Sequence, residues 1–197
     1  MLHKNLNGSK PVDLKDEDPD VLNEYMNCVY VGQKALEHFS GNVKSHANGG
    51  HQDEAIAGLQ ALIRLYLFAE KLQDLTTANM VIDEIMRFSD IAEWVPDSSN
   101  FRDVYDNTTP QSTLRRLMRD YWLYEMSPTY DRALHELPVE LMQDILGETL
   151  RIKDKEKYTT VQKAFDKDLS FATKVDICRY HQHDDKCRKC APKSKSG

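Results

Sequence analysis

The chain is poor in glycine and proline, with 8 and 7 among 197 residues, and it contains only 4 cysteines. So few helix-breaking residues favour a mainly helical protein. Cys28 lies within a helical pattern, while Cys178, Cys187 and Cys190 lie near the C-terminus. This distribution is not typical of a disulfide framework and favours a reducing compartment.

Long apolar runs are also missing. No stretch approaches the length of a membrane-spanning helix, and residues 1–10 lack the apolar centre of a secretory signal. We therefore expect an intracellular protein, in the nucleus or the cytoplasm, with no membrane partner. The net charge of −6 argues against bulk affinity for nucleic acid.

Motifs of the common enzyme classes are absent as well. The sequence has no Gly-x-Ser-x-Gly elbow, no phosphate-binding glycine loop and no His-Glu-x-x-His pair. His135 and Glu136 precede a predicted helix, where Glu136 is expected to interact with the helix dipole rather than abstract a proton. We expect no catalytic residue, no small-molecule substrate and no cofactor apart from a metal considered below.

Helical periodicity is what the sequence has instead. Asp18 can cap a helix and Pro19 suits its first position, so a helix is predicted from residue 19 to Gly32, where it should stop. Apolar side chains recur along it at helical spacing and predict one buried stripe: Leu22, Tyr25, Met26, Val29 and Tyr30.

The next segment, residues 37–53, is rich in Ser, Gly, Asn and His and predicts a loop. Its three histidines, His38, His46 and His51, could collect a metal, but a solvated loop is the favoured interpretation because no rigid element fixes their geometry.

Two helices after this loop are predicted to form the centre of the core. The helix at 54–71 is apolar around most of its circumference. A turn at Gln73 and Asp74 leads to a second helix, which Thr76 or Thr77 can cap. The inward residues of this second helix are predicted to be Ala78, Val81, Ile82, Ile85 and Met86, and the outward ones Asp83, Glu84 and Arg87.

Residues 94–100 interrupt the periodicity and are the best candidate for a boundary. A helix is predicted from 110 towards Pro128, and another from 138 to 150. The first should bury Leu114, Leu117, Met118, Tyr121 and Trp122 and carry Arg115, Arg116 and Arg119 on its opposite face, as a grip for an acidic partner or as a solvated surface. The second should bury Leu141, Met142, Ile145, Leu146 and Thr149. Residues 151–169 are highly charged and indicate a solvated helix or a linker.

The sharpest chemical pattern is Cys178-x2-His181-x-His183-x3-Cys187-x2-Cys190. Thiolate and imidazole are preferred zinc ligands, and four of these five residues could close a tetrahedral site. The stretch is short, however, and it leads into a basic tail with lysines at 186, 189, 193 and 195. A flexible solubilising tail is therefore the favoured interpretation, with zinc binding as the alternative. A nuclear localisation signal or a contact with nucleic acid is a weaker interpretation of the same basic residues.

Three stretches resemble fungal BTB/POZ proteins. The first pairs Leu14, Glu17, Asp18 and Pro19 with Val29, Tyr30 and Gly32. The second, Leu65-Tyr-Leu-Phe-Ala-Glu-Lys71, is similar to the helix usually written Leu-Tyr-Val-Phe-Ala-Asp-Lys. The third, Cys178-Arg-Tyr-His-Gln-His-Asp-Asp185, is similar to the tails of that group.

This resemblance implies a mainly α fold made of a partial BTB/POZ-like helical domain with a C-terminal helical extension. The C-terminal half of the domain would occupy residues 1–92, the extension 93–170 and a Cys/His-containing basic tail 171–197. The strand–helix half that opens a complete BTB domain has no counterpart here, so the chain looks like a truncated or alternatively started member, and dimerisation of the family's kind is not expected to carry over.

The resemblance also implies a function. Related domains self-associate or present substrates to cullin-type ubiquitin ligases, so we expect a protein-binding adaptor or scaffold without catalysis. Its contacts would come from exposed residues of the helices at 19–31 and 55–72. The alternative is a zinc-binding regulatory module that uses Cys178, His181, His183, Cys187 and Cys190.

Overall fold

A computed structural model describes residue 14 and residues 17–43, 52–125, 135–153 and 177–182. The protein is mainly α, as predicted, and the described residues contain no strand. None of the helices in these ranges is long and apolar enough to cross a membrane. The α-helices are α1 (Pro19–Val31), α2 (Glu37–Asn42), α3 (Gln52–Lys71), α4 (Leu75–Ala92), α5 (Ser98–Asn107), α6 (Thr113–Glu125) and α7 (Val139–Lys153); the 3-10 helices are η1 (Gly32–Leu36) and η4 (Ile177–Tyr180).

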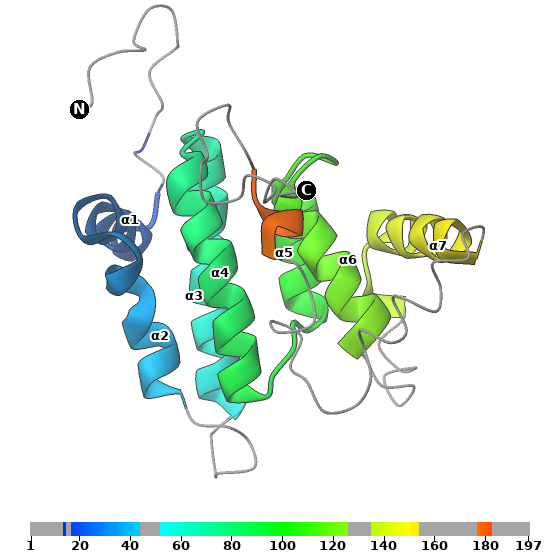
Figure 1. Cartoon of the computed structure of the whole chain (residues 1–197), viewed down its shortest axis with the longest axis horizontal. Coiled ribbons are helices and arrows are strands. Elements are labelled where there is room, and N and C mark those ends of the chain that lie inside the picture. The colour runs from blue at the N-terminus through cyan, green and yellow to red at the C-terminus, as the bar shows by residue number, and fades with distance from the viewer. Residues whose placement is uncertain (1–13, 15–16, 44–51, 126–134, 154–176, 183–197) are drawn as a thin grey trace, which may run out of the picture.

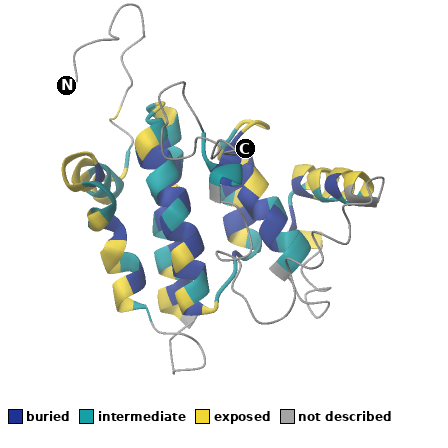
Figure 2. Ribbon diagram, viewed as in Figure 1, coloured by how far each residue is buried: buried dark blue, intermediate teal, exposed yellow. Residues whose placement is uncertain are grey.

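A helical hairpin of α3 and α4 lies at the centre of the molecule (Figure 1). Helices α1, η1 and α2 pack on one side of it, and α5 and α6 on the other, with α7 outermost beside α6. The short helix η4 packs against α4 and α6, although it comes from the far end of the sequence. Buried residues concentrate on α3, α4 and the inner faces of α5 and α6 (Figure 2).

Helix α1 begins and ends as predicted, but its buried face is different. The Asp18 side chain accepts a hydrogen bond from the Asp20 amide, and Gly32 ends the helix with φ of 75°. The predicted stripe is wrong at three positions, since Met26, Val29 and Tyr30 are exposed by 38%, 39% and 77%. The fully buried residue is Cys28. Helix α1 packs mainly on α3 and η1, so it buries a narrow face and leaves the rest of its apolar residues at the surface.

The predicted loop at 37–53 is wrong over its first part. Residues 32–42 form η1 and α2, because two side chains tie this stretch to neighbouring groups. Ser40 is buried and its hydroxyl donates a hydrogen bond to Glu84 of α4. His38 Nδ1 lies 2.8 Å from the Ala35 carbonyl oxygen. The other two histidines of the predicted loop, His46 and His51, lie outside the described residues.

The predicted core of α3 and α4 is confirmed, with two corrections. Every inward residue predicted for α4 is at most 1% exposed. The N-cap is Asp74 rather than a threonine, because its carboxylate accepts hydrogen bonds from the Thr76 and Thr77 amides at 3.1 Å each. Glu84, predicted to point outward, is 0% exposed, because it accepts the hydrogen bond from Ser40 and pairs with Arg87 at 3.1 Å.

Helix α5 was not predicted, because its sequence is polar and its first three residues fall within the predicted break at 94–100. Asp97 caps it with a reciprocal capping box, in which Asn100 Oδ1 in turn accepts a hydrogen bond from the Asp97 amide. Phe101, Val104 and Tyr105 then join the same buried cluster as α3 and α4. The core is therefore continuous across the boundary predicted at residue 92.

Helices α6 and α7 follow the prediction in part. Leu114, Leu117, Met118 and Tyr121 of α6 are buried as expected. On α7 only Leu141 is fully buried, whereas Met142 and Leu146, both predicted to face inward, are exposed by 40% and 60%. Helix α7 lies at the edge of the molecule and packs mainly against α5 and α6. Much of its surface therefore has no neighbouring helix among the described residues to cover it.

Gly58 of α3 lies directly against the Phe88 ring of α4. A Cβ at this position would lie 2.6 Å from Cζ of this buried ring and 2.7 Å from its Cε2, so that the ring or the helix would have to shift. Gly58→Ala is therefore expected to lower the free energy of unfolding by about 1–3 kcal/mol, measured by urea denaturation. The control is Gly147→Ala on α7, where a Cβ meets nothing within 4 Å; it should stabilise the protein by about 0.5–1 kcal/mol. Equal effects of the two substitutions would contradict the close approach.

Candidate binding groove

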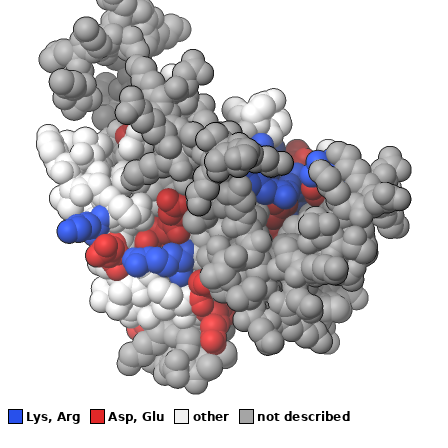
Figure 3. All heavy atoms as spheres, viewed as in Figure 1, with Lys and Arg blue, Asp and Glu red and all other residues white. Residues whose placement is uncertain are grey.

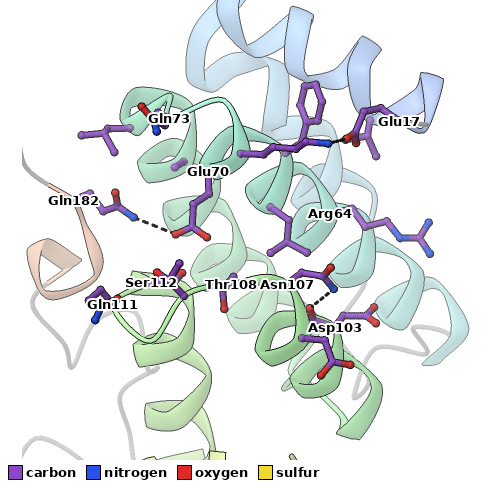
Figure 4. A pocket seen from close by; sticks show the side chains of 18 of the residues that line it. Glu17, Arg64, Glu70, Gln73, Asp103, Asn107, Thr108, Gln111, Ser112 and Gln182 are labelled. Carbon is purple, nitrogen blue, oxygen red and sulfur yellow. Dashed lines mark hydrogen bonds and ion pairs between the residues drawn. The ribbon is translucent and has the colours of Figure 1, made fainter. Parts of the chain in front are cut away.

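A groove with a volume of about 1320 Å³ opens between α3 and α5. One wall is the C-terminal half of α3 with the residues that precede α1, and the other is the end of α5 with the turn that leads into α6 (Figure 4). Its lining comprises Glu17, Asp18, Val21, Arg64, Leu67, Phe68, Glu70, Lys71, Gln73, Leu75, Ala78, Asp103, Asp106, Asn107, Thr108, Thr109, Gln111, Ser112 and Gln182.

The apolar part of the lining comes from helices α1, α3 and α4. Phe68 and Ala78 belong to the buried core, and Val21, Leu67 and Leu75 are half-buried. The Phe68 ring is held by an edge contact with Tyr25 of α1, at 5.1 Å between ring centroids. This surface is therefore rigid, since it belongs to packed helices rather than to loops.

The polar part of the lining is predominantly acidic, with five carboxylates against two basic side chains. Glu17 pairs with Lys71, and Asp18 lies 4.0 Å from Arg64. Asp103 and Asp106 differ from these, because neither carboxylate makes a hydrogen bond or an ion pair with any residue that the structure describes. They project one helical turn apart from the end of α5. The groove therefore has an excess of negative charge on its α5 wall.

A polar network closes one end of the groove. The Tyr66 hydroxyl lies 2.9 Å from Thr113 Oγ1 and 3.3 Å from Glu70 Oε1. Gln182 donates from Nε2 to the same carboxylate oxygen of Glu70 at 3.4 Å. Burial raises the pKa of Tyr66 against the opposing effect of its hydrogen bonds with Ser112 and Thr113. The hydroxyl therefore stays protonated and acts as a structural link between α3 and the start of α6.

The C-terminal segment 178–182 is held on the helices, whereas the sequence predicted a flexible tail over residues 171–197. The Asn79 side chain of α4 makes two hydrogen bonds with the main chain of Gln182, each 2.8 Å long. Its Nδ2 donates to the Gln182 carbonyl oxygen, and its Oδ1 accepts from the Gln182 amide. His181 Nε2 lies 2.7 Å from Asp83 Oδ1. Tyr180 is 0% exposed. These contacts hold the segment against α4 and α6.

A buried charge network anchors the same segment to α6. Asp120, which is 0% exposed, lies 2.7 Å from Arg119 Nη2 through Oδ1 and 2.8 Å from Arg179 Nη2 through Oδ2. The Tyr180 hydroxyl donates to Asp120 at 2.9 Å. Burial and the neighbouring charge of Asp120 raise the pKa of Tyr180, so this hydroxyl remains a donor.

Glu148 of α7 extends the network. It pairs with Arg151 and lies 3.6 Å from both Arg119 and Arg179. Burial alone would raise its pKa, but the hydrogen bond from Arg151 and the guanidinium charges outweigh burial and lower it. Both carboxylates of the network are therefore fully engaged with guanidinium groups, which suits an anchor between α6, α7 and η4 rather than proton transfer.

The basic face predicted on α6 is wrong. Arg115 is 8% exposed, donates to the Thr108 hydroxyl at 2.8 Å and stacks over the Tyr105 ring at 4.5 Å. Arg119 belongs to the charge network, and Arg116 donates to the Arg179 carbonyl at 2.7 Å. On the face seen in Figure 3, acidic and basic side chains of the described residues lie next to one another rather than forming a single basic field.

Only two members of the predicted zinc set are described. Cys178 lies in η4 and is half-buried, and the His181 ring contacts Asp83. The remaining members, His183, Cys187 and Cys190, lie outside the described residues. Within the described ranges, no group of three His, Cys, Asp or Glu side chains is placed to hold a metal ion. The zinc site stays a prediction.

The acidic wall of the groove was missed at the sequence level. Asp103 and Asp106 belong to a helix that the sequence did not predict; Asn79 lay in no motif, and Gln182 appeared only within the C-terminal stretch 178–185. The spacing of the two aspartates by three residues was the available signal, but it does not show which element they face. The chain matches no known family model, no curated protein and no solved structure.

Proposed function

We propose that this chain is a protein-binding module, without catalysis, that holds a basic and partly apolar segment of a partner protein in the groove between α3 and α5. The observation that carries the proposal is the pair of carboxylates at Asp103 and Asp106, which face a groove with an apolar floor and have no counter-charge among the described residues.

Charge complementarity favours a basic ligand. The other acidic groups of the groove are already engaged: Glu17 with Lys71, Asp18 with Arg64, and Glu70 with Gln182. A lysine or arginine of a partner would provide a positive counter-charge for Asp103 and Asp106. Such charge complementarity sets the orientation of the partner and the association rate at interfaces. Acidic segments and nucleic acid would be repelled by the same wall.

The size and shape of the groove favour a peptide over a small molecule. Its volume of about 1320 Å³ exceeds the roughly 300–1000 Å³ of typical small-molecule pockets. Leu67 and Leu75 line it as half-buried apolar side chains and offer contacts for an apolar anchor of the ligand. Peptide recognition commonly combines such anchors with charged contacts at the rim.

The resemblance to fungal BTB/POZ proteins supports the same class of function. It extends the proposal to an adaptor or scaffold, with a cullin-type ubiquitin ligase as the partner class that it implies. The helix at 55–72, which the resemblance marked as a contact element, contributes Arg64, Leu67 and Lys71 to the groove.

The proposal is tested with fluorescein-labelled peptides in which Lys and Arg alternate with Leu and Phe, and with matched peptides in which Glu replaces the basic residues. We expect only the basic peptides to bind in fluorescence anisotropy. The double substitution Asp103→Asn with Asp106→Asn should weaken binding by about 2- to 30-fold, because each exposed ion pair contributes roughly 0.2–1 kcal/mol.

The matched control is Asp53→Asn with Glu140→Gln, which removes two exposed carboxylates that do not line the groove. This control should bind the basic peptides like the parent protein. Equal affinity for basic and acidic peptides would contradict the proposal, and so would equal losses in the two double variants.

A further inference from the structure

The chain carries a basic segment close to the groove in sequence. Residues 186–195 contain Lys186, Arg188, Lys189, Lys193 and Lys195 and no acidic residue. The segment begins four residues after Gln182, and Gln182 itself lines the groove. The ligand chemistry that fits the groove is therefore present in the same molecule.

The structure describes the chain up to Gln182, four residues before this segment. The main chain of Gln182 is held by Asn79 through two hydrogen bonds of 2.8 Å, and its side chain reaches Glu70 in the groove wall (Figure 4). Arg179 and Tyr180, just before it, are anchored on buried Asp120. Gln182, the last residue that the structure describes, is therefore held at the edge of the groove.

We propose that residues 186–195 dock in the groove against Asp103 and Asp106, as an intramolecular occupant that a partner must displace. This inference rests on the proposed function and names a regulator of the same site. Five basic side chains in ten residues complement the acidic wall, and the four residues from Gln182 to Lys186 span up to roughly 13 Å. The segment can therefore reach the groove without any movement of η4.

The covalent connection of the segment to the rest of the chain strengthens this contact, and the lack of large apolar side chains in the segment makes the contact reversible. A short connection gives an effective concentration on the order of 1 mM, so weak ion pairs suffice for substantial occupancy. The segment has no large apolar side chain, and Leu67 and Leu75 therefore stay available. A partner segment with both basic and apolar residues has the advantage of the additional apolar contacts and displaces the tail.

The first test compares the full-length protein with a full-length variant in which Lys186, Arg188, Lys189, Lys193 and Lys195 are replaced by Gln. The variant should bind the basic peptides described above about 3- to 10-fold more tightly, because it lacks the competing segment. On the Asp103→Asn, Asp106→Asn background the same replacement should change the affinity less than twofold. An unchanged affinity on the parent background overturns the inference and leaves the proposed function standing if the peptides bind.

A second measurement detects docking without any peptide. A carbodiimide joins lysine amines to carboxylates in direct contact, and mass spectrometry of the monomer band should show links from the tail lysines to Asp103 or Asp106. Links to Glu140 of α7, which is exposed and remote from the groove lining, should be rarer. Links found only in a dimer band, or spread evenly over exposed carboxylates, overturn intramolecular docking. A different outcome is that the tail lysines are linked to Asp103 but no variant binds a peptide. This outcome would refute the proposed partner and support the intramolecular docking of the tail.

Discussion

Asp120→Asn is expected to lower the free energy of unfolding by about 3 kcal/mol, the lower end of the range for breaking a buried ion pair. The substitution keeps the shape of the side chain and removes its charge, leaving Arg119 and Arg179 without the carboxylate that both contact. The Arg179 side chain is 33% exposed and keeps a distant contact with Glu148, which limits the loss. Urea denaturation of the full-length protein measures the effect.

The substitution should also release the C-terminal segment before the rest of the molecule unfolds. Arg179 and Tyr180 both depend on Asp120, so trypsin should cleave after Arg179 faster in the variant than in the parent protein. Asp106→Asn serves as the control, because Asp106 is exposed and has no ion pair among the described residues. It should change stability by less than about 0.5 kcal/mol. Comparable losses in both variants would show that Asp120 is not a buried anchor.

This network illustrates what sequence periodicity does not reveal. Asp120 follows three arginines on one predicted helix, and local spacing made them look like a solvated charged surface. Two of its partners, Arg179 and Tyr180, lie about 60 residues away, and no local pattern connects them. The charges become neighbours only because η4 packs on α6.

The central helices were predictable because each has one dominant apolar face. On α4 all five residues predicted to face inward are buried, since a helix enclosed by neighbours buries most of its apolar face; buried Glu84 and exposed Ile91 are the departures. Helices α1 and α7 carry apolar side chains on more of their surface than they bury, as Tyr30 and Leu146 show. A single sequence cannot tell which of these faces meets a neighbour, because the choice depends on the positions of the other helices.

The groove was beyond prediction for a similar reason. Its lining runs from Glu17 to Gln182 and combines helix ends that the fold brings together. The sequence favoured a binding protein because it lacks common catalytic motifs and resembles an interaction domain, and this function stays a proposal. It marked one wall of the groove, on α3, and missed the acidic wall because α5 itself was not predicted.

Ile82→Asp is expected to abolish folding of the α3–α4 hairpin and with it the cooperative unfolding transition of the protein. Ile82 is 0% exposed and lies in the buried cluster, so the new carboxylate would have to remain charged without a partner or be protonated at a large cost. Losses above about 4 kcal/mol are expected for such a buried charge, which approaches the total stability of a typical domain. Far-ultraviolet circular dichroism should show a loss of helix.

The same helix offers a matched control in Ile91→Asp, at a position that is 40% exposed. Both substitutions replace isoleucine by aspartate within α4, so they change intrinsic helix propensity similarly and differ chiefly in burial. Ile91→Asp should retain the helical spectrum, lose less than about 1.5 kcal/mol in urea denaturation and bind the basic peptides like the parent protein. A native spectrum and an unchanged urea midpoint for Ile82→Asp would place α4 at the surface. The groove would then lose its apolar floor, because Leu75 and Ala78 belong to the same helix.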